Sequence, residues 1–389
     1  MASPGADLLD LVPEERIVAW TRAFVRQPTE QTSSFEDDPH IQRFLGENVG
    51  GALDEIGAPW RRDGLGNVLA EHGEGPVRVI IMAYAMTHPA NRMRDAFSGD
   101  LIDTDEGPAI RGRGVAEQKS SLAAAIAAFA GVRASGAQGR VVLAVSAAGE
   151  TGTHRAAEAI CAAIDARPEF GIVAIGTNGR VSLANKGRID VDVTIRGRAN
   201  HSSAPWGGID AIRGARRALD RLDALDLSEP RHPRLGPATL CATAIESWPK
   251  ATHTIQDEVR MTFDRRLLPG QSPQDAFHEI ESALGDLAPW TAQASLTRIQ
   301  LPAEIAGDDA LLQHIDRAHA QAGLPVPERF DSHGCTDAGY LQSLGVAPTM
   351  WGPGDQAQWH ADDERILVCD LVAGARSYFA FLAAVLGSR

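Results

Sequence analysis

The pattern of apolar and polar positions divides the chain into regions with two different periodicities. Over residues 1–187, short apolar runs such as residues 77–82 and 139–146 alternate with stretches of helical period. Apolar runs of this length, rich in β-branched residues and bounded by turn residues, indicate buried strands. The Ala-rich run after Lys119 predicts a buried helix, and helices are also expected over residues 8–25 and 37–56. Alternating strands and helices predict an α/β domain whose sheet is mostly parallel and covered by helices.

The pattern of apolar and polar residues changes at residue 188. Residues 189–195 (IDVDVTI) alternate strictly, as a strand with one solvated face does. The elements expected after it are a helix, two strands, a helix and a final strand, over residues 211–225, 238–245, 259–263, 273–284 and 292–299. The order β-α-β-β-α-β is that of a ferredoxin-like α+β domain. We therefore predict an inserted domain at residues 188–300, with residues 1–187 and 301–389 forming the α/β domain.

Composition narrows the range of partners and compartments. The 389 residues carry a formal net charge of -14, which argues against nucleic acid or an anionic membrane as a partner. The four cysteines have no CxxC spacing, so a reducing compartment fits them best. The N-terminus lacks the basic residues of a signal peptide, and no apolar stretch is expected to reach membrane-spanning length. A cytoplasmic protein that acts on a small molecule is expected.

Five short motifs follow one another in a fixed order. They are AYAMTHP at 83–89, GRGVAEQK at 112–119, GRANHSSAPWGG at 197–208, DRRLLPG at 264–270, and GPG at 352–354 followed by HADDE at 360–364. Together they resemble the zinc aminoacylase and carboxypeptidase superfamily, which includes acetylornithine deacetylase, succinyl-diaminopimelate desuccinylase and glutamate carboxypeptidase. The resemblance spans nearly the whole chain. It implies that the inserted domain is a lid and a homodimer interface.

The resemblance also implies a metal site that is only half kept. Family members hold two zinc ions bridged by an Asp, whose position is Glu117 here. The Glu and His that bind only one of the two ions correspond to Glu150 and His360. The two residues that bind only the other ion correspond to Tyr84 and Thr177, which are poor zinc ligands. Three protein ligands are enough for one catalytic ion, and their chemistry suits zinc, manganese or iron(II). One ion and no ion at all are equally supported at this point.

The general base of the family is a second departure. Where relatives have Glu-Glu, this chain has Gly149 and Glu150. Glu150 is then either the metal ligand or, after a one-residue shift, the base, and both readings stay open. General base catalysis is typically worth about 100- to 10,000-fold in rate, so ordinary di-zinc hydrolysis is not expected.

Several other side chains remain candidates for chemistry. The resemblance gives His201 the role of polarising the scissile carbonyl across the dimer, and His253 stands where relatives usually have Asn. Tyr84 is a further candidate acid–base group at the emptied metal position. The alternative is that His201 only caps a turn and that Tyr84 only fills the space of the missing ion.

Substrate contacts are expected from four residues. By the resemblance, Arg265 binds a substrate carboxylate, as a planar guanidinium can. The resemblance also places Asp337 in a Gly-containing substrate loop, Glu117 at the position that bridges the ions, and Lys119 beside the emptied metal position. For Lys119 and His88 taken singly a structural role is favoured. Cys335, in the same loop as Asp337, is interpreted as a small buried hydrophobe rather than a nucleophile.

Three function hypotheses follow. The first is an amide or related C–N hydrolase that acts on a small carboxylate-bearing N-acyl compound with at most one metal ion. The second is a metal-independent enzyme that uses the same pocket for lyase, isomerase or acyl-transfer chemistry. The third is a non-catalytic relative that binds a ligand.

Overall fold

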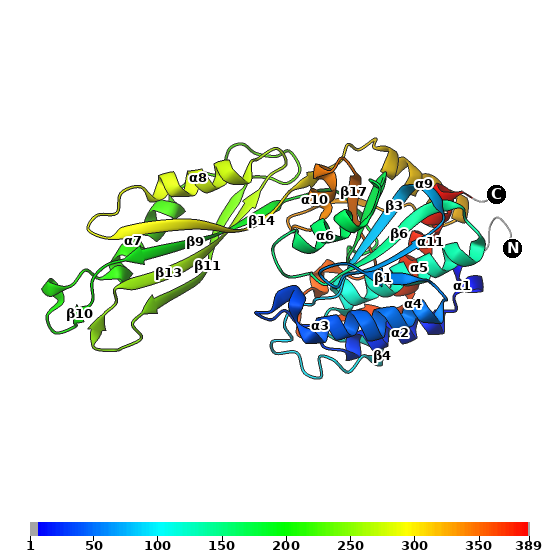
Figure 1. Cartoon of the computed structure of the whole chain (residues 1–389), viewed down its shortest axis with the longest axis horizontal. Helices are drawn as coiled ribbons and strands as arrows, with labels where there is room; N and C mark the ends of the chain where they lie inside the picture. The colour runs from blue at the N-terminus through cyan, green and yellow to red at the C-terminus, as the bar shows by residue number, and fades with distance from the viewer. Residues whose placement is uncertain (1–6, 388–389) are drawn as a thin grey trace. The chain divides into compact units, whose positions relative to one another are not determined.

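The computed structural model describes residues 7–387, which form two compact units (Figure 1). Unit 1 contains the chain up to Leu183, Ile305–Phe330 and the chain from Tyr340 onward. Unit 2 contains Ala184–Glu304 and Asp331–Gly339. The units therefore divide at 183/184 and 304/305 rather than at 187/188 and 300/301, and a short segment around residue 335 belongs to unit 2 instead of unit 1.

Unit 1 is built on a six-stranded sheet. Its strand order is β1-β2-β6-β3-β7-β17, in which β6, β3, β7 and β17 are parallel while β1 and β2 are antiparallel to their neighbours. The mostly parallel α/β prediction is confirmed. The strand bounds are Trp60–Arg62 for β1, Val68–His72 for β2, Glu74–Tyr84 for β3, Gly139–Ser146 for β6, Phe170–Ala174 for β7 and Ala347–Trp351 for β17.

Helix α5 (Ser120–Ser135) is the central helix of unit 1. Its Ala-rich first three turns are buried, and α1 (Leu8–Leu11), α2 (Glu14–Arg26) and α11 (Val368–Leu386) all pack against it. By length and composition α11 could cross a membrane, contrary to the sequence expectation, but 61% of its apolar window is buried inside the fold. In this unit it is a core helix.

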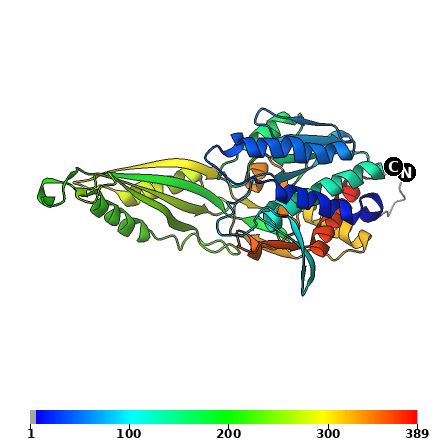
Figure 2. The same cartoon turned by 90° about the horizontal axis from the view of Figure 1, so that it is seen from below.

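Two expected helices are broken, and unit 1 has an additional small sheet that was not expected. Pro13 separates α1 from α2, and the second expected helix consists of α3 (Pro39–Arg43), a π-helical turn over Phe44–Val49 and α4 (Gly50–Glu55). The additional sheet has the order β18-β5-β4, with β4 at Asp100–Thr104, β5 at Gly107–Arg111 and β18 at Arg365–Leu367. The β4–β5 hairpin, drawn in cyan, projects from unit 1 (Figure 2). The remaining elements outside the core of unit 2 are α6 (Arg155–Ala163), β8 (Val181–Asn185), β15 (Ala303–Glu304), α9 (Ala310–Ala322), β16 (Arg329–Ser332) and α10 (Ala338–Ser343).

Unit 2 has the predicted β-α-β-β-α-β order. Its antiparallel sheet runs β11-β13-β9-β14, and the odd-numbered apolar residues of β9 and β13 form one core with both helices. A separate two-stranded ribbon pairs β10 with β12. The bounds are Gly187–Arg196 for β9, Asn200–His201 for β10, Ala211–Asp223 for α7, Thr239–Trp248 for β11, Thr254–Ile255 for β12, Glu258–Leu267 for β13, Pro273–Leu284 for α8 and Thr291–Gln300 for β14.

Candidate active site

Unit 1 brings together three side chains that can hold a metal ion. Glu117 comes from a π-helical turn over Val115–Lys119, Glu150 follows β6, and His360 lies in the loop before β18. Their ligand atoms all lie within 4.8 Å of one another. His360 Nε2 is 3.2 Å from Glu117 Oε2 and 3.9 Å from Glu150 Oε1. These are the three residues for which the sequence predicted metal binding.

The turn that carries Glu117 is held by a buried carboxylate. Glu364 accepts hydrogen bonds from the backbone N–H groups of Gly114, Ala116 and Glu117, and its Oε2 lies 2.9 Å from Arg113 Nη1. Gly114 has a φ of 75°, a left-handed conformation that glycine adopts without steric cost. Burial raises the pKa of Glu364 to about 7, while the hydrogen bond from Gly114 opposes that rise. The turn is therefore fixed by the segment that follows His360.

The other two members of the cluster are also positioned by neighbours. Gln118 Nε2 donates to Glu150 Oε1 at 3.1 Å, and Gln31 Nε2 donates to the backbone oxygen of Glu150 at 2.7 Å. His360 has a φ of 61°, which is uncommon for a residue other than glycine. The hydrogen bond to Glu117 raises the pKa of the His360 imidazole, despite its partial burial.

The donor set fits one divalent ion. Metal–ligand bonds of about 2.0–2.2 Å in a tetrahedral arrangement place donor atoms about 3.4 Å apart, which is close to the two distances from His360. One imidazole and two carboxylates suit zinc, manganese or iron(II). Within residues 7–387, this is the one group of three or more His, Cys, Asp or Glu side chains that is close enough to share an ion.

The positions of a second ion are occupied by other interactions. The Thr177 hydroxyl donates to the backbone oxygen of Arg180 at 2.6 Å and accepts from the N–H of Gly352 at 3.1 Å, so it serves the local backbone. Tyr84, at the end of β3, is 3% exposed and part of the core. The Thr177 hydroxyl is therefore engaged by the backbone, and Tyr84 is buried at the carboxyl end of β3.

Gly149 has no room for the glutamate side chain that the resemblance implies at this position. A Cβ atom on Gly149 would lie 2.4 Å from the backbone oxygen of Met86, far inside van der Waals contact. Gln118 holds Glu150 at the cluster, which favours the reading of Glu150 as a ligand over the reading that requires a one-residue shift.

His88 is a site residue that the sequence reasoning did not favour. Its ring stacks on the ring of His360, with centroids 3.8 Å apart and planes inclined by 18°. His88 Nδ1 lies 3.0 Å from the backbone oxygen of Pro89, and burial together with His360 lowers the pKa of His88. The available signal was its place in the first motif, four residues beyond Tyr84 at the carboxyl end of β3, where ligands of α/β sheets bind.

Lys119 is buried among structural contacts, so its expected contact with substrate stays a prediction that these contacts do not support. The side chain is 1% exposed, and its Nζ donates to Thr29 Oγ1 at 2.7 Å and lies 3.5 Å from the centre of the Phe44 ring. Burial lowers the pKa of Lys119 well below that of an exposed lysine. Asp337, the other loop candidate, is also buried, in unit 2.

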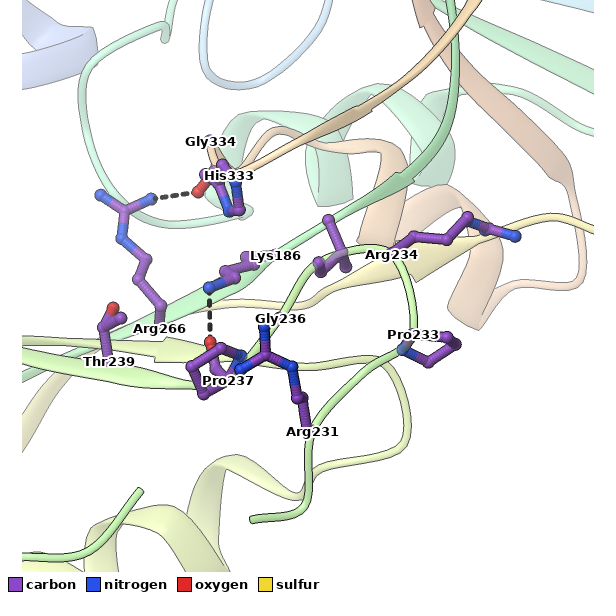
Figure 3. Close-up of a pocket in the computed structure, with 11 residues that line it drawn as sticks. Lys186, Arg231, Pro233, Arg234, Gly236, Pro237, Thr239, Arg266, His333 and Gly334 are labelled. Carbon is purple, nitrogen blue, oxygen red and sulfur yellow. Dashed lines mark hydrogen bonds between the residues drawn. The ribbon is translucent and has the colours of Figure 1, made fainter. Parts of the chain in front are cut away.

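Arg265 is buried and paired, so the expected contact between Arg265 and a substrate carboxylate stays a prediction that its surroundings do not support. It is 1% exposed, its Nη2 pairs with Glu279 Oε2 of α8 at 2.9 Å, and its Nη1 donates to the backbone oxygen of Arg266. Arg266 is the next residue of β13, and its side chain lines a pocket in unit 2 (Figure 3). Alternation along the strand therefore transfers the candidate role in carboxylate binding from Arg265 to Arg266.

The two histidines of the inserted domain, His201 and His253, lie together. His201 on β10 and His253 just before β12 have ring centroids 5.7 Å apart, because these two short strands pair. His201 is exposed, and its Nδ1 lies 2.7 Å from Ser203 Oγ. Both are in unit 2, whereas the carboxylate cluster is in unit 1.

Comparison with known proteins identifies the family. The model of peptidase family M20/M25/M40 matches residues 88–384. The chain belongs to this family. It is therefore a member of a hydrolase family that generally depends on divalent metal, and the resemblance seen in the motifs is confirmed.

Relatives of this M20 family member include several deacylases. It is 28% identical to acetylornithine deacetylase of Myxococcus xanthus over 288 residues, which cover 71% of this chain and 73% of that protein. It is 24% identical to succinyl-diaminopimelate desuccinylase of Sulfurimonas denitrificans over 262 residues, covering 66% and 70%.

Solved structures agree on the fold. A metallo-carboxypeptidase of the M20 family from Sulfolobus solfataricus superposes with a TM-score of 0.78 at 15% identity, covering 95% of this chain and 99% of that one. Human carnosine dipeptidase 1 gives a TM-score of 0.75 at 15% identity, covering 96% and 97%.

Proposed function

We propose that this M20 family member hydrolyses an amide bond in a small N-acyl compound that bears a carboxylate, with one divalent ion held by Glu117, Glu150 and His360. The observation that supports the proposal is the convergence of these three ligand atoms within 4.8 Å. The relatives named as deacetylase and desuccinylase support an acylated amino acid as the substrate class. Zinc, manganese and iron(II) all suit this donor set.

In this proposal, different residues bind the cation, the substrate carboxylate and the scissile carbonyl. A bound divalent cation polarises a carbonyl and lowers the pKa of bound water. Glu117, Glu150 and His360 would hold the cation, and Gln118 orients Glu150 through a hydrogen bond to its Oε1 atom. Arg266, whose Nε and Nη2 pair with Asp264, lines the pocket of unit 2 and is the proposed guanidinium for the substrate carboxylate. His201 and His253 form the pair of imidazoles through which a lid can reach a scissile carbonyl.

Metal analysis combined with a substrate panel tests the proposal. The protein is stripped with chelator, reloaded with zinc, manganese or iron(II), and its metal content is measured by elemental analysis. Turnover is then measured on N-acetyl- and N-succinyl-amino acids and on dipeptides. We expect one ion per chain and amide cleavage that chelation abolishes.

His360→Ala provides the matched comparison, with the exposed His40→Ala as its control. We expect His360→Ala to lose the ion and the activity, and His40→Ala to keep both. Two ions per chain would refute the half-filled site. Turnover that survives chelation would replace the proposal with metal-independent chemistry, and metal or ligand binding without any turnover would replace it with a binding role.

A further inference from the structure

The imidazole of His360 has little local structure to hold it. His360 lies in the loop before β18 with a φ of 61°, and its side chain is 42% exposed. A metal-binding histidine usually donates its second ring N–H to a carboxylate or a backbone carbonyl, and this hydrogen bond fixes the ring. Within residues 7–387, the polar contacts of the His360 ring run through Nε2 to Glu117 and Glu150, and Nδ1 has no such partner.

The ring of His88 covers one face of the His360 ring. The two centroids are 3.8 Å apart and the planes are inclined by 18°, so the rings lie almost flat on one another. Stacked rings of this kind attract one another beyond the area that they bury. Turning the His360 ring out of its plane would break the stack. The contact therefore favours the orientation in which His360 Nε2 faces Glu117.

His88 is itself held in place by its surroundings. Its Nδ1 lies 3.0 Å from the backbone oxygen of Pro89. The backbone N–H of Ala90 donates to Glu30 Oε1 at 2.6 Å, and the backbone oxygen of Ala90 accepts from Arg113 Nη2 at 3.1 Å. The His88 ring therefore rests on a segment whose backbone is anchored on both its donor and its acceptor side.

Arg113 joins the two segments that carry the stacked rings. Its Nη2 reaches Ala90, two residues after His88, and its Nη1 lies 2.9 Å from Glu364 Oε2, four residues after His360. The Arg113 side chain is buried, so this link belongs to the core of unit 1. The stack is therefore supported by the fold and is more than a meeting of two loop side chains.

The geometry separates His88 from the metal ligands. A ring nitrogen directs its lone pair in the plane of the ring, and a zinc–nitrogen bond is about 2.0–2.1 Å long. Because the two planes are stacked and nearly parallel, an ion bound in the plane of His360 lies outside the plane of His88. The group of ligand atoms within 4.8 Å of one another likewise contains Glu117, Glu150 and His360 but not His88.

We propose that His88 is a positioning residue, which holds the His360 imidazole in its metal-binding orientation by stacking, in place of the usual hydrogen bond. This inference rests on the proposed metal site and deepens it, because it gives a role to a side chain that does not bind the ion. It requires the flat face of the His88 ring and neither of its nitrogens.

Zinc affinity, measured on the full chain by competition with a chromophoric chelator, tests the proposal without any substrate. We expect His88→Ala to bind zinc at least tenfold more weakly, since loss of a partner that orients a ligand typically costs about 10- to 100-fold in metal affinity. His88→Leu fills a similar space without a flat face and should also bind weakly. His88→Phe keeps the ring face and should bind within about threefold of the wild type.

His314→Ala is the matched control. His314 on α9 is also half-buried beside an aromatic ring, with its centroid 5.4 Å from that of Phe170, and its loss should leave zinc affinity unchanged. The absorption spectrum of the cobalt(II)-loaded protein is the second readout, and its ligand-field bands should be the same in His88→Phe and the wild type.

Three results would overturn the proposal. Wild-type affinity in both His88→Ala and His88→Leu would show that the stack does not position His360. Weak zinc binding by His88→Phe, or altered cobalt bands in that variant, would show that a nitrogen of His88 is needed. A wild type that binds zinc no more tightly than His360→Ala would instead refute the metal site itself, and the inference with it.

Discussion

Placing at position 149 the glutamate that the resemblance implies should damage the fold rather than create a general base. A Cβ at Gly149 would lie 2.4 Å from the backbone oxygen of Met86, so the loop or the end of β3 has to move by about an ångström. Overpacking of this kind typically costs about 1–3 kcal/mol. For a unit of this size, that corresponds to a fall of roughly 2–12 °C in melting temperature. Gly149→Ala and Gly149→Glu should both show it, measured by scanning calorimetry.

Gly51→Ala is the matched control for this measurement. Gly51 lies in α4, and a Cβ there would meet nothing within 4 Å. Because alanine is the better helix former, this variant should be about 0.5–1 kcal/mol more stable than wild type. The reasoning is refuted if Gly149→Glu melts at the wild-type temperature and hydrolyses substrate faster, since both results require an open position for a general base.

Three further predictions concern other parts of the chain. Chelation should remove the ion and lower the melting temperature of the wild type but leave His360→Ala unchanged, which calorimetry with and without chelator checks. Burial raises the pKa of Cys335 to about 11, so at pH 8 only about one thiol in a thousand is ionised. Iodoacetamide should therefore label the exposed Cys241 first and Cys335 only as the pH approaches 11, which peptide mass mapping measures. Rapid labelling of Cys335 at pH 7 would contradict this. Arg113→Met should lower the free energy of unfolding by about 3–5 kcal/mol, because it leaves the buried Glu364 carboxylate without its cation. Denaturant unfolding measures this change, and a decrease below about 1 kcal/mol would show that stability does not depend on the ion pair.

Periodicity predicted most of the regular elements because burial controls it. The apolar run at residues 139–146 became β6 with the same bounds, and the helix at residues 273–284 became α8. The sheet β18-β5-β4 escaped prediction because its strands are three to five residues long and come from distant parts of the chain. The broken helix over residues 37–56 contains a π-helical turn, which no simple period reveals.

At the candidate site, resemblance of motifs alone selected some residues correctly, but Arg265 shows that strand alternation also has to be considered. Glu117, Glu150 and His360 converge as the motifs predicted, because the motifs fix both residue type and place. Arg265 was chosen from its motif alone, although the buried Val259, Met261 and Phe263 share its odd-numbered parity on β13. Because the odd-numbered residues of β13 are buried, alternation along the strand would have favoured Arg266 over Arg265. The stacking of His88 on His360 depends on loop conformation, for which the sequence offered no comparable pattern.

The bond between Glu364 and the turn that carries Glu117 has a consequence for folding. Glu364 lies 248 residues further along the chain than Ala116, whose N–H it accepts, and His360 comes from the same segment as Glu364. Local structure alone therefore does not fix the turn that carries Glu117. The three ligand side chains meet only after these distant segments have folded together.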